Sequence, residues 1–140
     1  MQLTQATDYS FRVILHLTRA TPGEVVAAKT LAEREEIPMR YLLKIIRSLV
    51  KAGILNSHRG MEGGYSLAKE PGDITLLEVV EAIEGPIQIN RCLEDQAYCS
   101  KHWCHSCPLH HALKNIQETL IQELKRCNFA VLNHKNLNPT

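Results

Sequence analysis

The sequence predicts a mainly helical protein with a small β-wing, in which a winged helix-turn-helix domain precedes a long C-terminal helix. Apolar residues recur at helical spacing in the first three segments of the 140-residue chain. A glycine-rich turn between two strand-like segments follows, and a second apolar stripe begins after Pro108. We therefore expect a winged domain over residues 1–85, a cysteine-rich loop over 86–107 and a dimerisation helix over 108–133.

The first three predicted helices are bounded by residues that favour helix ends. A stripe over residues 4–18 stops before a Thr-Pro-Gly turn, and a short amphipathic helix fits residues 28–35. Pro38 suits the first position of the third helix, because its missing N–H would have no partner there. Gly53 is a suitable C-cap, so this helix should end at Ala52.

The next segment predicts a hairpin and a fourth helix. Residues 54–59 and 64–67 have strand character, and the glycine-rich turn between them has hairpin length. Thr75 and Glu78 form a capping box at the start of the fourth helix, which Gly85-Pro86 ends. Three helices followed by a two-stranded ribbon is the order of a winged helix-turn-helix.

The third helix carries its cations opposite its apolar residues. At about 100° per residue, Lys44, Arg47 and Lys51 fall within about 40° of Arg40. The residues expected in the core occupy the other side of the wheel: Leu42, Leu43, Ile45, Ile46, Leu49 and Val50. A helix fits the major groove when one face anchors to a core and the other offers donors to phosphates and bases. Any surface helix carries some Lys and Arg, but the neighbouring wing favours DNA binding.

We predict double-stranded DNA as the partner, contacted by the third helix and the wing. The candidate contacts on the helix are Met39, Arg40, Tyr41, Lys44 and Arg47. Arg59 and Gly60 open the glycine-rich turn, where backbone can approach the sugar-phosphate chain closely and an arginine can enter the minor groove.

Four of the five cysteines lie in the loop before the last helix, with six, four and two residues between successive members: Cys92, Cys99, Cys104 and Cys107. Soft thiolates at this density suit an iron-sulfur cluster or zinc, and spacing alone does not separate the two. Neighbours such as Glu94 and Lys101 argue against buried thiols that act as small hydrophobes. Cys127 lies on the apolar stripe of the last helix and is predicted to be a core residue.

The last helix has an apolar stripe at steps of three and four residues, formed by Leu109, Leu113, Ile116, Leu120, Leu124, Cys127 and Val131. A helix of roughly 20 residues is about 30 Å long, so it overhangs a domain of this size. The uncovered part of the stripe predicts a partner surface, although the helix of a monomer could also fold back on its own domain. Residues 134–140 are expected to be disordered.

Composition excludes several classes of protein. The formal net charge of +1 excludes a general polycation, and 5% aromatic residues give little support to a stacking platform for single-stranded nucleic acid. With no apolar run of about 20 residues and no leader-like start, we expect a cytoplasmic protein without a membrane partner, in which thiols stay reduced. No nucleophile-base arrangement, phosphate loop or paired carboxylates indicate an enzyme.

The chain resembles the regulator family that contains IscR, NsrR, RirA and CymR, the Rrf-two superfamily. Three features carry the resemblance over nearly the whole chain: the start LTQATDYSFRVILHL, the stretch from IPMRYLLKII to GGYSLAKEPGDITLLEVVEAIEG, and cysteines ahead of a long helix. The resemblance implies homodimers that bind palindromic operators, usually as repressors, with long C-terminal helices crossing between subunits.

The resemblance also implies a [2Fe-2S] or [4Fe-4S] cluster held by three cysteines of this loop, whereas this chain has four. Cys104 fits the usual spacing of the third ligand, and Cys107 fits its usual context just before the helix. If only three bind, Asp8 is a candidate fourth ligand, because it matches the position that in NsrR supplies a carboxylate from the partner subunit. An acidic residue in a first helical turn is also stabilised without any metal.

These observations predict a regulator whose operator affinity follows the state of a cluster, sensing redox, nitric oxide or iron status. The cysteines lie between the DNA domain and the dimer helix, so a change there can alter the spacing of two recognition helices, which must lie about 34 Å apart. One alternative is a regulator that binds zinc, or one switched by a disulfide between Cys104 and Cys107. A small iron-sulfur redox protein is a further alternative, but it would not need the basic helix or the wing.

Overall fold

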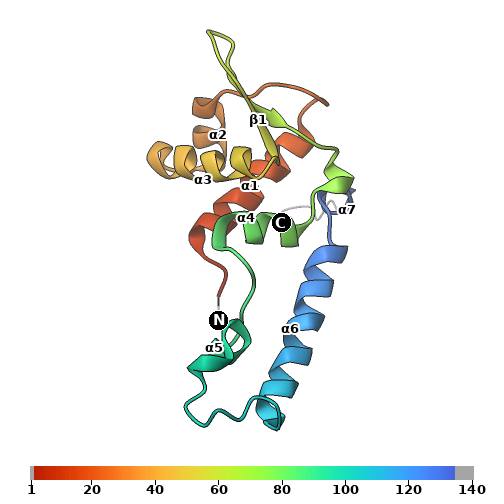
Figure 1. Cartoon of the computed structure of the whole chain (residues 1–140). Coiled ribbons are helices and arrows are strands. Elements are labelled where there is room, and N and C mark those ends of the chain that lie inside the picture. The colour runs from red at the N-terminus through yellow and green to blue at the C-terminus, as the bar shows by residue number, and fades with distance from the viewer. Residues whose placement is uncertain (1, 135–140) are drawn as a thin grey trace.

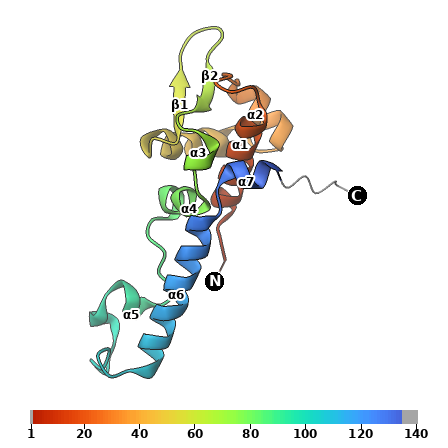
Figure 2. The ribbon, with the colours of Figure 1, turned by 90° about the vertical axis from the view of Figure 1, so that its right-hand side faces the viewer.

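Helices and one short hairpin follow one another in the order that the sequence predicts (Figure 1). The computed structural model describes residues 2–134, so the expectation of disorder lies outside the described residues except for His134, which is helical. The elements are α1 (Gln5–Arg19), α2 (Ala28–Glu35), α3 (Met39–Lys51), β1 (Leu55–His58), β2 (Gly64–Leu67), α4 (Leu76–Glu84), α5 (Arg91–Glu94), α6 (Pro108–Arg126) and α7 (Phe129–His134). The wing and α5 lie at opposite ends of the molecule, and α6 runs between them (Figures 1 and 2).

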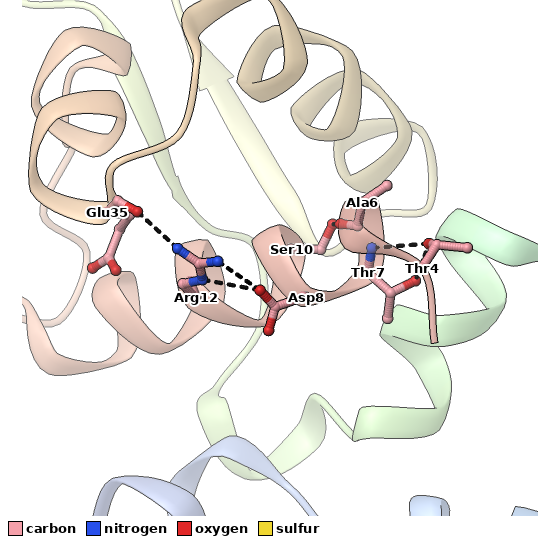
Figure 3. A network of polar contacts seen from close by, with 7 residues as sticks. All are labelled: Thr4, Ala6, Thr7, Asp8, Ser10, Arg12 and Glu35. Carbon is pink, nitrogen blue, oxygen red and sulfur yellow. Dashed lines mark hydrogen bonds and ion pairs between the residues drawn. The ribbon is translucent and has the colours of Figure 1, made fainter. Parts of the chain in front are cut away.

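Helix α1 is the centre of the winged domain, because it packs against α2, α3, α4 and α7. Its first turn is fixed by the Thr4 hydroxyl, which accepts a hydrogen bond from the Thr7 N–H at 3.3 Å (Figure 3). Fully buried side chains from every part of the domain meet around it, among them Ile14, Leu31, Leu42, Ile46, Leu49, Ile54, Ile74 and Phe129. The expected mainly helical winged fold is confirmed.

Helix α3 buries a narrower face than the sequence predicts. Leu42, Ile45, Ile46 and Leu49 are buried as expected, but Leu43 is 41% exposed. Leu43 lies only about 40° from Arg47 around the helix, which places it nearer the cationic face than the centre of the apolar face. Pro38 is the residue just before the helix and not its first residue.

The wing pairs with one more backbone segment than the hairpin pattern predicts. β1 and β2 pair antiparallel, with Leu55 opposite Leu67 and His58 opposite Gly64. Val26, in the turn after α1, forms an additional bridge with Tyr65 through two hydrogen bonds of 2.9 Å. Gly64 is required beside this bridge, because a Cβ atom there would lie 2.3 Å from the carbonyl oxygen of Val26.

The predicted single helix over residues 108–133 is interrupted, which corrects the sequence-based expectation. Helix α6 ends at Arg126, and the Cys127 carbonyl accepts the Leu76 N–H at 2.9 Å. The Phe129 N–H donates to the Ile74 carbonyl at 3.1 Å. Backbone hydrogen bonds to the winged domain therefore replace the hydrogen bonds that would continue the helix. Cys127 is half-buried at this break, and Val131 falls on α7 and not on the stripe of α6.

Helix α7 completes the core of the winged domain. Phe129 is 1% exposed, and its ring centroid lies 6.5 Å from that of Phe11 in α1. The core of the winged fold therefore includes Phe129 of α7, a segment that the sequence pattern assigns to the long helix.

Replacing Phe129 with alanine should lower the free energy of unfolding by about 3–5 kcal/mol, because it removes a fully buried aromatic ring. Urea unfolding at a fixed protein concentration measures the change. Val131→Ala on the same helix is the control and should cost under about 1 kcal/mol, because Val131 is 44% exposed. Equal losses for the two variants would contradict the burial of α7 in the core.

Candidate nucleic-acid interface and cysteine loop

The predicted DNA contacts of α3 lie on the solvent-exposed part of the helix. All five are exposed in the structure: Met39, Arg40, Tyr41, Lys44 and Arg47. The opposite face of α3 is anchored in the core by residues such as Leu42 and Leu49. The helix therefore meets the requirement for a groove-reading helix, with donors on one side and a fixed apolar base on the other.

Two of these residues form a contact that the sequence does not reveal. The Arg40 guanidinium carbon lies 4.8 Å from the ring centroid of Tyr41, and its Nη2 donates to the Tyr41 hydroxyl at 3.0 Å. A guanidinium stacked on an aromatic ring gains a cation–π interaction and loses rotamer freedom. Tyr41 thus restrains Arg40 on the exposed face of α3.

The wing presents Arg59 and Gly60 at its tip, both exposed. Gly60 has a φ of 105°, and its carbonyl accepts the Gly63 N–H at 3.0 Å, which closes the turn. A Cβ atom on Gly63 would lie 2.5 Å from the His58 carbonyl oxygen. The tip is therefore a tight turn that depends on glycine and projects away from the rest of the domain (Figure 1).

Polar contacts join α1 to the end of α2 and so position the helix-turn-helix (Figure 3). Arg12 binds the Asp8 carboxylate, with its Nη2 2.6 Å from Oδ2, and donates from Nη1 to the Glu35 carbonyl at 3.0 Å. The hydrogen bond that Arg12 donates to Asp8 raises the pKa of Arg12. His16 adds a contact of 2.9 Å from Nδ1 to the Glu35 carboxylate. These bonds fix the carboxyl end of α2 just ahead of α3.

Asp8, the candidate fourth ligand, lies in the first turn of α1 with a side chain that is 58% exposed. Both of its hydrogen bonds to Arg12 go to Oδ2. Among residues 2–134, no hydrogen bond or ion pair joins Asp8 to the cysteine loop of its own chain. Its position in the first turn also fits stabilisation by the helix dipole.

The four loop cysteines come from successive short elements beside the start of α6. Cys92 lies in α5, Cys99 follows a 3₁₀ turn over Gln96–Tyr98, and Cys107 is the N-cap of α6. Cys104 is 4% exposed and the other three are partly buried, and all are free thiols. The short elements explain why this stretch shows no apolar period in the sequence.

Neighbouring groups of the loop shift the pKa values of two of its thiols. Backbone N–H groups lower the pKa of the Cys99 thiol, first that of Trp103 and then that of Lys101. Burial raises the pKa of the Cys104 thiol, and the nearby Cys99, Cys92 and Cys107 thiols raise it further. Four thiolates in one place would repel one another unless a cationic centre compensated their charge.

His110 contacts two of these cysteines, although its sequence pattern did not mark it as a functional residue. It is 8% exposed, and its Nδ1 lies 3.2 Å from the Cys92 sulfur. Its backbone N–H donates to the Cys107 sulfur at 3.5 Å, as an N-cap side chain on α6 requires. The sequence signal that could have indicated this contact is the place of His110 three residues after Cys107, at the third position of a helix that begins with proline.

The donor set fits a thiolate-bound centre in chemistry, since soft sulfur ligands suit iron-sulfur clusters and zinc. Within the described part of the chain, however, no three side chains of His, Cys, Asp or Glu are arranged to hold a metal ion as they stand. Binding would therefore require the loop over residues 92–107 to close around its centre.

Comparisons with known proteins identify the family. A model of the Rrf2 family, described as iron-dependent transcriptional regulators, matches residues 3–135. NsrR of Bacillus subtilis is 36% identical over 116 residues, which is 81% of this chain and 77% of that protein. A helix-turn-helix regulator of Rhodobacter capsulatus described as Rrf2-like is 37% identical over 106 residues, 74% of this chain and 71% of that protein.

Solved structures agree on the fold. CymR of Bacillus subtilis, described as its global cysteine regulator, superposes with a TM-score of 0.78 at 24% identity, covering 96% of this chain and 97% of that one. IscR of T. potens gives a TM-score of 0.71 at 21% identity, covering 100% of this chain and 93% of that one. None of the helices described between residues 2 and 134 is long and apolar enough to cross a membrane. The family match over nearly the whole chain, supported by two relatives above 30% identity, shows that this chain belongs to the Rrf2 family of transcriptional regulators.

Proposed function

We propose that this protein is a homodimer that binds a palindromic operator in double-stranded DNA, acts as a repressor in the cytoplasm, and carries an iron-sulfur cluster that controls its affinity for the operator. The observation that carries the proposal is the division of the molecule into two ends. The cationic α3 and the wing lie at one end, and the segment over residues 91–107 that carries the four cysteines lies at the other (Figures 1 and 2). Its relatives are transcriptional regulators and not enzymes.

Contact with DNA rests on the exposed face of α3 and on the wing. Lys44 and Arg47 provide charges for phosphates, and the Arg40–Tyr41 pair provides an oriented guanidinium for base edges. Arg59 follows β1 and leads into the glycine turn, from which it can reach the minor groove next to the helix.

Dimer formation rests on the apolar side chains that α6 leaves uncovered. Leu109 is 71% exposed, Ile116 55% and Leu120 37%, all on a helix whose start stands clear of the winged domain (Figure 2). Exposed apolar side chains in a row along a helix mark a surface that another molecule covers. A second copy of α6 presents the same stripe and satisfies both helices at once.

Cys92 and Cys99 would hold the cluster, together with Cys104, Cys107 or both. When bound, an iron-sulfur cluster supplies a centre that responds to redox state, nitric oxide or iron supply. Cys107 caps α6 and Cys92 belongs to α5, which packs against α6, so these ligands join the loop to the dimer helix. If only three thiols bind, the Asp8 carboxylate of the partner is the candidate for the remaining position.

One relative and the description of the matching family model support this cofactor. NsrR matches most of the chain, and the matching family model is described as iron-dependent. Zinc is the second candidate, because it takes the same four thiolates without redox chemistry. The Cys104–Cys107 disulfide is a further alternative, and all five cysteines are free thiols in the structure.

Protein purified without air should absorb visible light and contain iron and sulfide, and Cys92→Ser and Cys99→Ser should abolish both because each removes a thiolate ligand. Cys127→Ser is the matched control and should keep the cluster, since Cys127 lies at the break after α6. Comparing Cys104→Ser with Cys107→Ser identifies the third ligand.

A colourless protein that contains zinc would support zinc as the bound metal in place of the cluster. Equal operator affinity with and without the cluster would contradict sensing.

Replacing Lys44 or Arg47 with alanine should weaken binding to every duplex and reduce the slope of log K against log salt concentration by about one, because each loses one phosphate contact. Binding titrations over a salt series measure this slope. Lys114→Ala removes the same charge from α6 and should leave the slope unchanged. A similar fall in the salt slope for all three variants would show that the total positive charge, and not the exposed face of α3, determines binding.

Ile116→Glu should shift the protein from dimer to monomer at micromolar concentration, because it places a charge in the apolar stripe of α6. Sedimentation equilibrium measures the shift, and Gln122→Glu, an exposed polar position on the same helix, serves as the control. An unchanged dimer in the Ile116 variant would place the interface elsewhere.

A further inference from the structure

A pocket with a volume of about 640 Å³ lies between α1, α3 and α4. Its apolar wall is formed by Ala6 of α1, Ile45 of α3 and Ile83 of α4. Among the described residues that line it, Lys44 and Glu84 alone are charged. A concave site of this size, with an apolar wall and a few polar groups that converge on it, suits a small molecule.

The two charges of this pocket have opposite signs and come from different helices. Lys44 lies on α3, and Glu84 is the last residue of α4. In the part of the chain that the structure describes, neither side chain forms an ion pair. The Glu84 Oε2 accepts the Thr7 hydroxyl and, at 3.4 Å, the Thr4 N–H, so Oε1 is free of these described contacts. The pocket therefore offers one ammonium group and one carboxylate to a ligand.

A third polar group of the pocket is positioned by burial of the ring that carries it. Tyr9 is only 9% exposed, and its hydroxyl takes part in none of the hydrogen bonds described for residues 2–134. Over the same residues, no fully buried side-chain oxygen or nitrogen lacks a partner, so this hydroxyl is open to solvent. Tyr9 lines the pocket. A hydroxyl on a buried ring, without a partner in the protein, is a preorganised donor for a ligand.

We infer that this pocket binds a small zwitterion with an apolar side chain, supplied as a free amino acid or as a very short peptide. Glu84 holds the ammonium group of the ligand, Lys44 and the Tyr9 hydroxyl hold its carboxylate, and the apolar wall covers its side chain. A phosphate is disfavoured because it meets the Glu84 carboxylate, and an amine without a carboxylate leaves Lys44 without a partner.

The ligand also competes with DNA, a consequence that rests on the proposed function. Lys44 is one of the proposed phosphate contacts, and a carboxylate bound to it neutralises the charge that a phosphate would use. Saturating ligand should therefore lower the salt slope of wild-type binding to a duplex by the same amount as Lys44→Ala does. The salt slope of the Lys44→Ala variant should not respond to the ligand.

The binding test uses the full-length protein without DNA, prepared without air, in ligand-observed NMR titrations. The probes are L-leucine, the dipeptide glycyl-L-leucine, and two analogues of leucine that each lack one charge. Isocaproate lacks the ammonium group and isoamylamine lacks the carboxylate, so each should bind about tenfold more weakly than leucine or the dipeptide, whichever binds better. Comparing leucine with the dipeptide distinguishes a free amino acid from a peptide as the ligand.

Variants test the assigned roles. Glu84→Gln should weaken the better zwitterion about tenfold and leave isocaproate unchanged, because glutamine keeps an acceptor for Thr4 and Thr7 but loses the charge that faces the ammonium group. Tyr9→Phe should weaken both ligands, because both carry the carboxylate. Glu81→Gln, exposed on the same helix and outside the pocket, is the control and should change neither.

The outcomes separate this inference from the proposed function. A protein that binds neither leucine nor the dipeptide, or a Glu84→Gln variant that loses zwitterion and isocaproate equally, would overturn the inference while DNA binding stands. Zwitterion binding with an unchanged salt slope would overturn the competition at Lys44. A protein that binds the zwitterion but no duplex would overturn the proposed function and leave the pocket assigned.

Discussion

The attachment of α6 to the winged domain is the constraint on which the arrangement of the two ends depends. At its carboxyl end the helix stops where Thr75 and Asn128 pair as an isolated bridge, and Phe129 then enters the core. At its amino end the helix begins with Cys107 as its cap. Helix α6 therefore connects the cysteine loop to the core that anchors α3, and in the proposed regulator a change in the loop would reach α3 through α6 and this core.

The molecule as a whole is almost neutral, and several of its cations lie on α3. A net charge of +1 would give a weak general attraction to DNA, so specific binding depends on where the cations lie. Arg40, Lys44 and Arg47 gather on one face of α3, and Arg59 is exposed on the wing. In the proposed complex with DNA, the contact of Arg40 with Tyr41 before binding would reduce the side-chain entropy that is lost when the guanidinium meets a base.

The sequence predicted the winged domain well because its helices and strands have strong local signals. Periodicity, Pro38 and the capping box at Thr75 located α1 to α4 and the hairpin. The break between α6 and α7 escaped prediction because Cys127 and Val131 continue the helical period, and no proline or glycine marks the change. Its cause is pairing with Thr75, some fifty residues away in the chain. The four loop cysteines were recognised by spacing, but the contact of His110 with Cys92 depends on how α5 packs against α6.

The number of cysteines determines how the two subunits of the proposed dimer would be connected. Four thiolates from one loop complete a ligand set within a single chain, and such a centre acts on the dimer only through α5 and α6. Three thiolates leave a position that a carboxylate of the partner could fill, which would join the loop of one chain to α1 of the other. Asp8 uses only Oδ2 for Arg12 among the described contacts, so the ion pair leaves its second oxygen available. In the proposed dimer, the fourth cysteine would thus decide whether the centre is internal to each chain or shared between them.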